Sequence, residues 1–253
     1  MNILTLRMVW ERLARRDPYW AVLTVPEKQG NRWKVDEFFQ TGIDDIEYSL
    51  ANLDRLLPGL PRRHALDFGC GVGRLSYALS RHFESVTGVD IAAQMLKLAQ
   101  KHQQAGTPSV TFLHNSQSDL RLFPDGEFDL VLSLITLQHN PPKLIEAYVR
   151  EFVRVVRSGG ALYFQLPVFL PPKDEPEIIR RSFYPPTIWK RLRLWTVQSF
   201  RQMRRITSKM SMHCLPEARV RKLLEEAGAT LVGTIEHQLD HGVRSMIYIA
   251  RKN

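Results

Sequence analysis

The sequence is poor in cysteine and has no long apolar run. Two cysteines, Cys70 and Cys214, are too few for a disulfide framework in 253 residues, which favours a reducing, cytoplasmic location. No apolar stretch reaches the roughly 18 residues that a membrane-spanning helix needs. Charged residues such as Arg7 and Glu11 interrupt the apolar N-terminus too early for a secretory signal. These absences exclude the disulfide-rich secreted class.

Acidic residues are also in the minority. There are 26 of them against 35 lysines and arginines, for a net charge of +9. This charge permits an anionic partner, nucleic acid or membrane, but identifies none. With 44% hydrophobic residues, the chain can form one good core. We therefore expect a single globular domain with an insertion.

Short apolar runs alternate with helical patterns from about residue 64 onward. Such alternation, with nearly continuous apolar strands, is typical of a parallel sheet covered on both faces, so the expected class is α/β. One helix should have Asn140 as its N-cap and end at Gly159-Gly160. Prolines interrupt the alternation after Pro167, and it resumes near residue 215. The expected units are an N-terminal aromatic cap (1–60), a core (61–167 and 215–253) and a helical lid insertion (168–214).

The stretch "LDFGCGVGRL" places three glycines, Gly69, Gly71 and Gly73, between a strand and a helix. Glycines there let the backbone approach a ligand closely. Their spacing is G-x-G-x-G, whereas dinucleotide enzymes use G-x-G-x-x-G. Asp67 precedes the loop, and its carboxylate would repel a pyrophosphate but suits an ammonium group, such as that of S-adenosylmethionine (SAM). Asp90 ends the next strand, where a carboxylate can accept hydrogen bonds from ribose hydroxyls.

In these motifs the chain resembles the class I SAM-dependent methyltransferases, from about residue 60 to the C-terminus. "DFGCGVGRL", "GVD", "FDLVLSLITLQH" and "RSGGALYF" are similar to motifs of that family. The resemblance implies a Rossmann-like seven-stranded sheet in the order 3-2-1-4-5-7-6 with strand 7 antiparallel. It implies SAM as methyl donor. We expect no metal, with a divalent ion held by His213, His237, Asp240 and His241 as the alternative. The expected cofactor site comprises Asp67, Gly69, Cys70, Gly71, Gly73, Asp90, Ile91, Met95, Ser116, Gln117 and Ser133.

The stretch "LQHNPPK" resembles the Asn-Pro-Pro-Tyr motif of enzymes that methylate adenine in nucleic acid. Here Asn140 comes several residues after the strand end at Ser133, and Lys143 replaces the aromatic residue that would stack on a flipped base. We therefore favour His139 as the functional residue. Its reference pKa of about 6.5 suits a general base for a hydroxyl acceptor, with a rate that rises through that pKa. The alternative is that His139 binds the cofactor or the backbone.

Two further segments could border the site. The N-terminal cap is dense in aromatic residues, which could close over the cofactor or form a satellite core. The stretch 187–209 has segregated apolar and basic faces and no acidic residue. It could be a lid helix or a peripheral contact with an anionic membrane.

The sequence thus predicts a methyltransferase that acts on a hydroxyl of a small molecule, which the resemblance extends to a sugar or glycan intermediate. His139 is the expected catalytic residue. The alternatives are an RNA or other nucleic-acid methyltransferase, for which no RNA-binding module is visible, and a non-catalytic SAM-binding protein. The expected acceptor contacts are Gln138, Gln165, His213 and His241, of which the last two could instead be loop residues in solvent.

Overall fold

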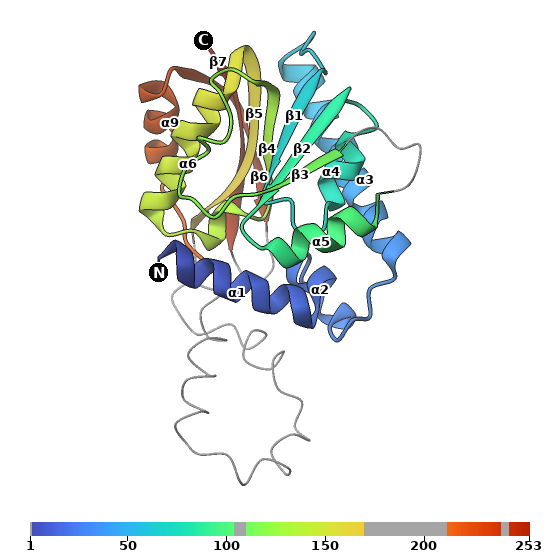
Figure 1. The fold of residues 1–253 in the computed structure, drawn as a ribbon. Helices are drawn as coiled ribbons and strands as arrows, with labels where there is room; N and C mark the ends of the chain where they lie inside the picture. The colour runs from blue at the N-terminus through green and yellow to red at the C-terminus, as the bar shows by residue number, and fades with distance from the viewer. Residues whose placement is uncertain (1, 104–109, 170–211, 239–242) are drawn as a thin grey trace, which may run out of the picture.

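The computed structural model describes residues 2–103, 110–169, 212–238 and 243–253. Their strands form one seven-stranded sheet in the order β3-β2-β1-β4-β5-β7-β6, which confirms the expected order (Figure 1). Strand β7 runs antiparallel to both neighbours, and the first five strands of that order are parallel. The strands are β1 His64–Phe68, β2 Ser85–Asp90, β3 Val110–His114, β4 Phe128–Ser133, β5 Val156–Phe169, β6 Ala229–Gln238 and β7 Arg244–Lys252.

Helices cover both faces of the sheet, as the apolar strands require (Figure 1). Helices α3, α4 and α5 pack on one face and α6 and α9 on the other. Helices α1 and α2 lie across the edge at which the parallel strands end. The helices are α1 Ile3–Arg16, α2 Pro18–Val22, η1 Pro26–Lys28, α3 Val35–Leu56, α4 Arg74–Leu79, α5 Ala93–Lys101, η2 Leu137–His139, α6 Pro142–Val155 and α9 Glu217–Glu226.

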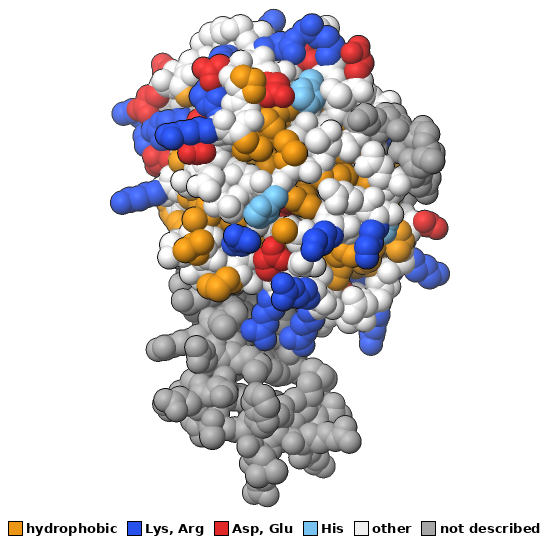
Figure 2. Space-filling view, viewed as in Figure 1, with side chains coloured by type: hydrophobic (Ala, Val, Ile, Leu, Met, Phe, Trp, Pro, Cys, Tyr) orange, Lys and Arg blue, Asp and Glu red, His pale blue; other side chains and the backbone are white. Residues whose placement is uncertain are grey.

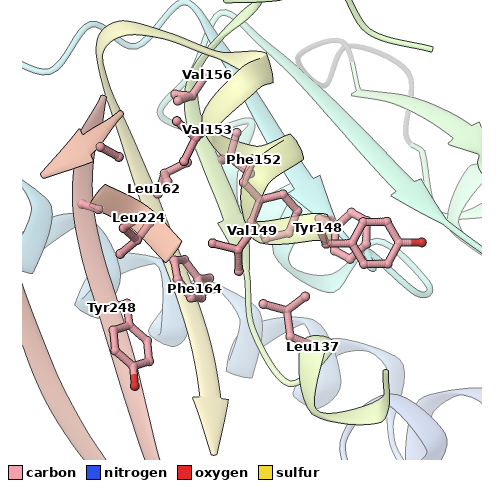
Figure 3. Close-up of a cluster of buried hydrophobic side chains, with 14 of the residues drawn as sticks. Leu137, Tyr148, Val149, Phe152, Val153, Val156, Leu162, Phe164, Leu224 and Tyr248 are labelled. Carbon is pink, nitrogen blue, oxygen red and sulfur yellow. The ribbon is translucent and has the colours of Figure 1, made fainter. Parts of the chain in front are cut away.

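Side chains of β1 alternate between the two hydrophobic layers. Ala65 faces the α3–α5 layer, whereas Leu66 and Phe68 face the α6–α9 layer. Figure 3 shows the second layer, where Val149 and Phe152 of α6 lie with Leu162 and Phe164 of β5. Leu137 of the short turn η2 belongs to the same cluster and is fully buried, so the core anchors this turn.

The helix after η2 differs from its predicted bounds. It begins at Pro142 with Pro141 as N-cap, and it ends at Val155, before Gly159. Asn140 as N-cap is therefore wrong. Its side-chain amide instead donates to Thr136 O (3.1 Å) and Leu137 O (3.4 Å), because η2 leaves these carbonyls of the preceding turn within reach. Strand β5 follows directly at Val156 and bulges near Gly160, which takes up the residues expected to extend the helix.

The N-terminal helix α1 docks on the sheet edge through an apolar face and one carboxylate. Val9 and Leu13 are buried in a third cluster that also contains Met95 of α5. The carboxylate of Glu11 accepts hydrogen bonds from Ala93 N (2.8 Å) and Gln94 N (3.4 Å). Helix α5 has no side-chain cap of its own, so Glu11 supplies it from a distant part of the chain.

Replacement of Glu11 should therefore destabilise the fold. We expect Glu11→Ala to lower the free energy of unfolding by about 1 kcal/mol, the usual loss of a helix cap. Urea denaturation followed by circular dichroism measures the change. Arg15→Ala is the matched control, because Arg15 is an exposed charged residue of the same helix. Equal loss in both variants would contradict the capping role.

The expected insertion falls almost entirely outside the described residues. The lid over 168–214, including the basic stretch 187–209, is described only at 168–169 and 212–214. Within the part of the chain that the structure describes, no helix is both long and apolar enough to cross a bilayer.

Candidate active site

A cavity lies at the edge where the parallel strands end. It encloses about 880 Å³ with its open mouth included. The loop after β1 and the end of β2 form one side, and the loop from β4 into η2 forms another. Leu6 and Trp10 of α1 and Val22 of α2 close the cavity from the N-terminal region. Ligands of open α/β sheets bind at this edge, so the cavity is the candidate site.

The glycine loop passes tightly between its neighbours. Gly69 has a φ of +77°, and a Cβ added there would lie 2.1 Å from Thr136 Cγ2. A Cβ at Gly71 would lie 2.8 Å from Val22 Cγ2. The amides of Gly69 and Cys70 both donate to Val89 O, which ties the loop to β2. Only glycine at position 69 permits both this backbone conformation and this approach.

Asp90, the last residue of β2, faces the same loop. Its Oδ2 accepts a hydrogen bond from Gly71 N (2.9 Å) and its Oδ1 accepts one from Ala92 N (2.8 Å). Burial raises the pKa of this carboxyl, although both backbone donors oppose the shift. Each carboxylate oxygen keeps a free lone pair, so Asp90 can accept further hydrogen bonds from two hydroxyls in the cavity.

Asp67 lies behind the glycine loop and does not line the cavity. It is only 1% exposed, and Ser76 Oγ donates to its Oδ2 at 2.6 Å. Burial raises its pKa to about 6, and the hydrogen bond from Ser76 opposes the shift. A role of Asp67 at the cavity would therefore depend on its charge rather than on contact.

His139, at the end of the turn η2 that follows β4, also lines the cavity. Its ring contacts the edge of Trp10, with ring centroids 5.1 Å apart and planes at 70°. Burial lowers its pKa to about 4, and the neighbouring His213 adds to the shift. The imidazole is therefore neutral near pH 7. Gln138 Nε2 lies 3.4 Å from His139 Nε2, and Nδ1 is buried without a hydrogen-bond partner in the described part of the chain.

The structure brings most of the expected cofactor residues together. Those that line the cavity with His139 are Gly69, Cys70, Gly71, Asp90, Ile91 and Met95. Gly73 lies outside the lining, at the start of α4. Ser133 is also outside it, fully buried, and its Oγ donates to Phe68 O at 3.1 Å.

Ser116 and Gln117 likewise lie outside the cavity lining. Gln117 is exposed, and its backbone amide donates to Asn115 Oδ1. Asn115, the first residue after β3, lines the cavity instead. Its position at the end of a parallel strand is a signal that could have identified it.

Of the four expected acceptor contacts, the structure brings none of the three that it describes into the cavity lining. Gln138 and Gln165 are buried outside the lining, and both ends of the Gln165 side chain bond to the protein. The backbone amide of His213 donates to Gln138 O at 2.7 Å, which places His213 beside η2. His241 lies outside the described residues. Within the described ranges, no group of three histidine, cysteine or acidic residues is placed to hold a metal.

Sequence reasoning did not identify Trp10, Arg74 and Tyr148, which also line the cavity. Arg74 is only 2% exposed, and its Nη1 donates to Thr41 Oγ1 (3.1 Å) and Asp45 Oδ2 (2.6 Å) of α3. An exposed ion pair contributes little to the stability of a fold. The guanidinium of Arg74 is buried, so its bonds to Thr41 and Asp45 hold α4 against α3. No local pattern indicates that α3 lies there.

Comparison with known proteins agrees with this geometry. Residues 65–160 match the family model described as "Methyltransferase domain". The chain is 34% identical over 133 residues to the "Ubiquinone biosynthesis O-methyltransferase" of Paracidovorax citrulli, which covers 52% of this chain and 55% of that protein. It is 36% identical over 131 residues to the "2-methyl-6-phytyl-1,4-hydroquinone methyltransferase" of Synechocystis, which covers 50% of this chain and 38% of that protein. These alignments thus span about half or less of each curated relative.

Solved structures show the same fold at low identity. The magnesium protoporphyrin IX methyltransferase of Synechocystis with bound SAH superposes with a TM-score of 0.56 at 22% identity, over 85% of this chain and 83% of that one. A SAM-dependent methyltransferase of Leishmania major superposes with a TM-score of 0.60 at 16% identity, over 96% and 83%.

Residues 65–160 thus match a methyltransferase domain, and the described residues share the fold of the two solved methyltransferases.

Proposed function

We propose that this chain is a SAM-dependent methyltransferase that methylates a hydroxyl of a small, largely apolar acceptor. One observation carries the proposal. The glycine loop after β1, Asp90 at the end of β2 and the neutral His139 after β4 all line one cavity, and in the sheet order β2-β1-β4 Asp90 and His139 lie on either side of the glycine loop. This arrangement suits a cofactor held on one side and an acceptor on the other, with the reacting atoms brought into line between them.

The residues on the first side fit SAM. Gly69 and Gly71 line the cavity, and because they carry no side chain the loop presents its backbone there while it passes close to Thr136 and Val22. The free lone pairs of Asp90 suit the two ribose hydroxyls, and Ile91 and Met95 offer apolar contacts to an adenine. Bound there, SAM supplies a methyl group that its sulfonium already activates. The charge of Asp67 behind the loop favours the ammonium group.

The residues on the second side favour an acidic hydroxyl. Leu6, Trp10 and Ile135 give that side an apolar surface. His139 is a weak base with a pKa of about 4. Proton transfer to it from a phenol of pKa about 10 is uphill by roughly 8 kcal/mol. From an alcohol as weakly acidic as water the cost is roughly 16 kcal/mol. We therefore infer that a phenol-like hydroxyl is a better acceptor than a sugar hydroxyl.

Names of two relatives support this class of acceptor. One of them is an O-methyltransferase of ubiquinone biosynthesis and the other acts on a hydroquinone. The two alignments cover about half of this chain, so the acceptor of this chain is tested directly. An acceptor screen with labelled SAM tests it, with simple phenols and hydroquinones in one set and monosaccharides and nucleosides in another.

The two rival functions predict different results in the same screen. An RNA methyltransferase should modify RNA and bind it with an affinity that falls steeply with salt. On the face drawn in Figure 2, lysine and arginine side chains gather along the lower part of the described surface with few acidic ones among them, whereas in the upper part basic and acidic side chains are interspersed. A non-catalytic SAM-binding protein should bind SAM and methylate neither set.

The first test concerns the cofactor. SAM should bind and NAD should not. Asp90→Asn should weaken SAM binding by about 1.5–3 kcal/mol, as expected when hydrogen bonds to a charged group are lost. Isothermal titration calorimetry measures both affinities. Asp54→Asn is the control, because its carboxylate pairs with Arg62 at an exposed position on α3. Unchanged SAM affinity in Asp90→Asn would remove this residue from the site.

A further inference from the structure

One residue of the cavity has an unusual backbone conformation. Ile135, in the loop after β4, has a φ of +61°. A β-branched side chain disfavours this left-handed region, and such residues persist only where their surroundings hold them. Strain of this kind is often found where a site needs a fixed geometry, and Ile135 lines the cavity.

Two buried residues of the sheet hold this conformation. Ile135 N donates to Gln165 Oε1 of β5 at 3.2 Å. The other end of the same amide, Gln165 Nε2, lies 3.2 Å from Ser245 Oγ of β7 and donates to it. Gln165 is 4% exposed and Ser245 is fully buried. Since both polar atoms of the amide bond to protein atoms, we infer that Gln165 holds the backbone at Ile135 and does not contact the acceptor.

The strained residue controls the direction of the chain toward His139. The next residue, Thr136, lies against Gly69, and its hydroxyl donates to Leu134 O at 3.1 Å. Thr136 O then accepts hydrogen bonds from His139 N and from Asn140 Nδ2, both at 3.1 Å. A reversal of φ at position 135 would turn Thr136 away from the glycine loop and shift η2 with His139.

We propose that Gln165, supported by Ser245, is a positioning residue that locks Ile135 in the left-handed conformation and so fixes the position of His139 in the cavity. The proposal rests on the methyltransferase function proposed above. The pair acts through the backbone of residues 135–139 and touches neither cofactor nor acceptor.

Gln165→Met is the first variant, because methionine keeps the length of the side chain but cannot accept the hydrogen bond from Ile135 N. We expect kcat for a phenol acceptor to fall roughly 10–100-fold, as misplacement of a catalytic group by about 1 Å does. The SAM dissociation constant should change less than threefold. Ser245→Ala should show a smaller loss of the same kind. Ser80→Ala, which removes a buried serine hydroxyl from α4, is the matched control and should change neither constant.

A compensating variant separates positioning from a merely structural role. Asparagine adopts positive φ more readily than isoleucine, so Ile135→Asn reduces the need for the lock. Because Ile135 also lines the cavity, the comparison is made within the Ile135→Asn background, where adding Gln165→Met should lower kcat by at most a third of the factor seen in wild type. If Gln165→Met only lowers the melting temperature and leaves kcat of the folded enzyme unchanged, the proposal is wrong. An equal loss of kcat from Gln165→Met in the wild-type and Ile135→Asn backgrounds would also overturn it.

Amide hydrogen exchange keeps this test independent of turnover. Exchange at Ile135 N should be at least tenfold faster in Gln165→Met than in wild type, and unchanged in Ser80→Ala. If the wild-type protein methylates no acceptor, the proposed function fails while this measurement still decides on the lock. Equal exchange rates at Ile135 in wild type and Gln165→Met would refute the lock itself.

Discussion

His139→Ala should lower kcat by roughly 10²–10⁴-fold, the usual contribution of a general base. The variant should keep nearly full SAM affinity, because His139 is not among the expected cofactor contacts. His139→Gln should lose as much, since glutamine can hydrogen-bond but cannot take the proton. The measurements are steady-state kinetics with a phenol acceptor and a parallel SAM titration.

His82→Ala is the control for this prediction, because His82 is paired with Glu47 at 3.0 Å outside the cavity. If turnover and SAM affinity fall together in His139→Ala, His139 orders the cofactor instead of serving as base. If neither changes, His213 beside η2 becomes the next residue to test.

The pH dependence of the rate should differ from that of an ordinary histidine. Only the neutral imidazole accepts a proton, and burial lowers the pKa of His139 to about 4. The base is thus fully available above roughly pH 5, and the expected rise through 6.5 is replaced by a rise at lower pH. The loss in His139→Ala should shrink at high pH, where the acceptor ionises without help. A wild-type rise centred near pH 6.5 would contradict the buried state of this ring.

The same pKa shift affects stability. A histidine whose pKa is depressed in the folded state is protonated more readily in the unfolded chain, whose pKa is near 6.5. Its contribution to stability is therefore complete above that value and declines as the pH falls from 6.5 toward 4. The stability of the fold and the catalytic rate should therefore both fall at low pH, because each requires the neutral imidazole of His139.

Gly69→Ala should have the second large effect. The added methyl group would lie 2.1 Å from Thr136 Cγ2. The alanine backbone would also have to adopt the left-handed conformation that Gly69 has. We expect the free energy of unfolding to fall by roughly 2–4 kcal/mol, which combines the cost of a left-handed alanine with the cost of the overpacked contact. SAM affinity should fall at least 30-fold, because the loop and the segment before His139 must separate.

Gly59→Ala separates the cost of the left-handed backbone from the cost of the steric contact. Gly59 has a φ of +80° but no atom within 4 Å of an added Cβ, so only the conformational cost applies there. Urea denaturation and calorimetry of both variants give the difference. Equal losses of stability, with SAM affinity intact in both, would mean that Thr136 moves aside at little cost.

Local patterns were sufficient for the α/β class and for part of the cofactor side, and the order of strands followed from resemblance. Asp90 and the glycine loop could be placed because they lie at the ends of strands, whereas Ser116 and Gln117 lie outside the cavity lining. The left-handed Ile135 could not be predicted, since isoleucine is among the residues least compatible with that conformation. Asn140 was misplaced because its amide donates backward into η2, whereas its residue type favours an N-cap.

Contacts between distant parts of the chain were beyond sequence reasoning. Trp10 meets His139, and Glu11 meets Ala93, across many intervening residues. Arg74 meets Asp45 of a helix whose position no motif indicates. These contacts depend on where whole elements pack, which local propensity does not specify.

The wall formed by Leu6, Trp10 and Val22 has a consequence for the order of assembly. Trp10 leaves the ribosome roughly 130 residues before His139, the residue that its ring contacts. Closing such long loops is slow. We therefore expect the sheet to form while the cavity is still open on one side, so that a newly made chain gains its binding site in a late step, after most of its core.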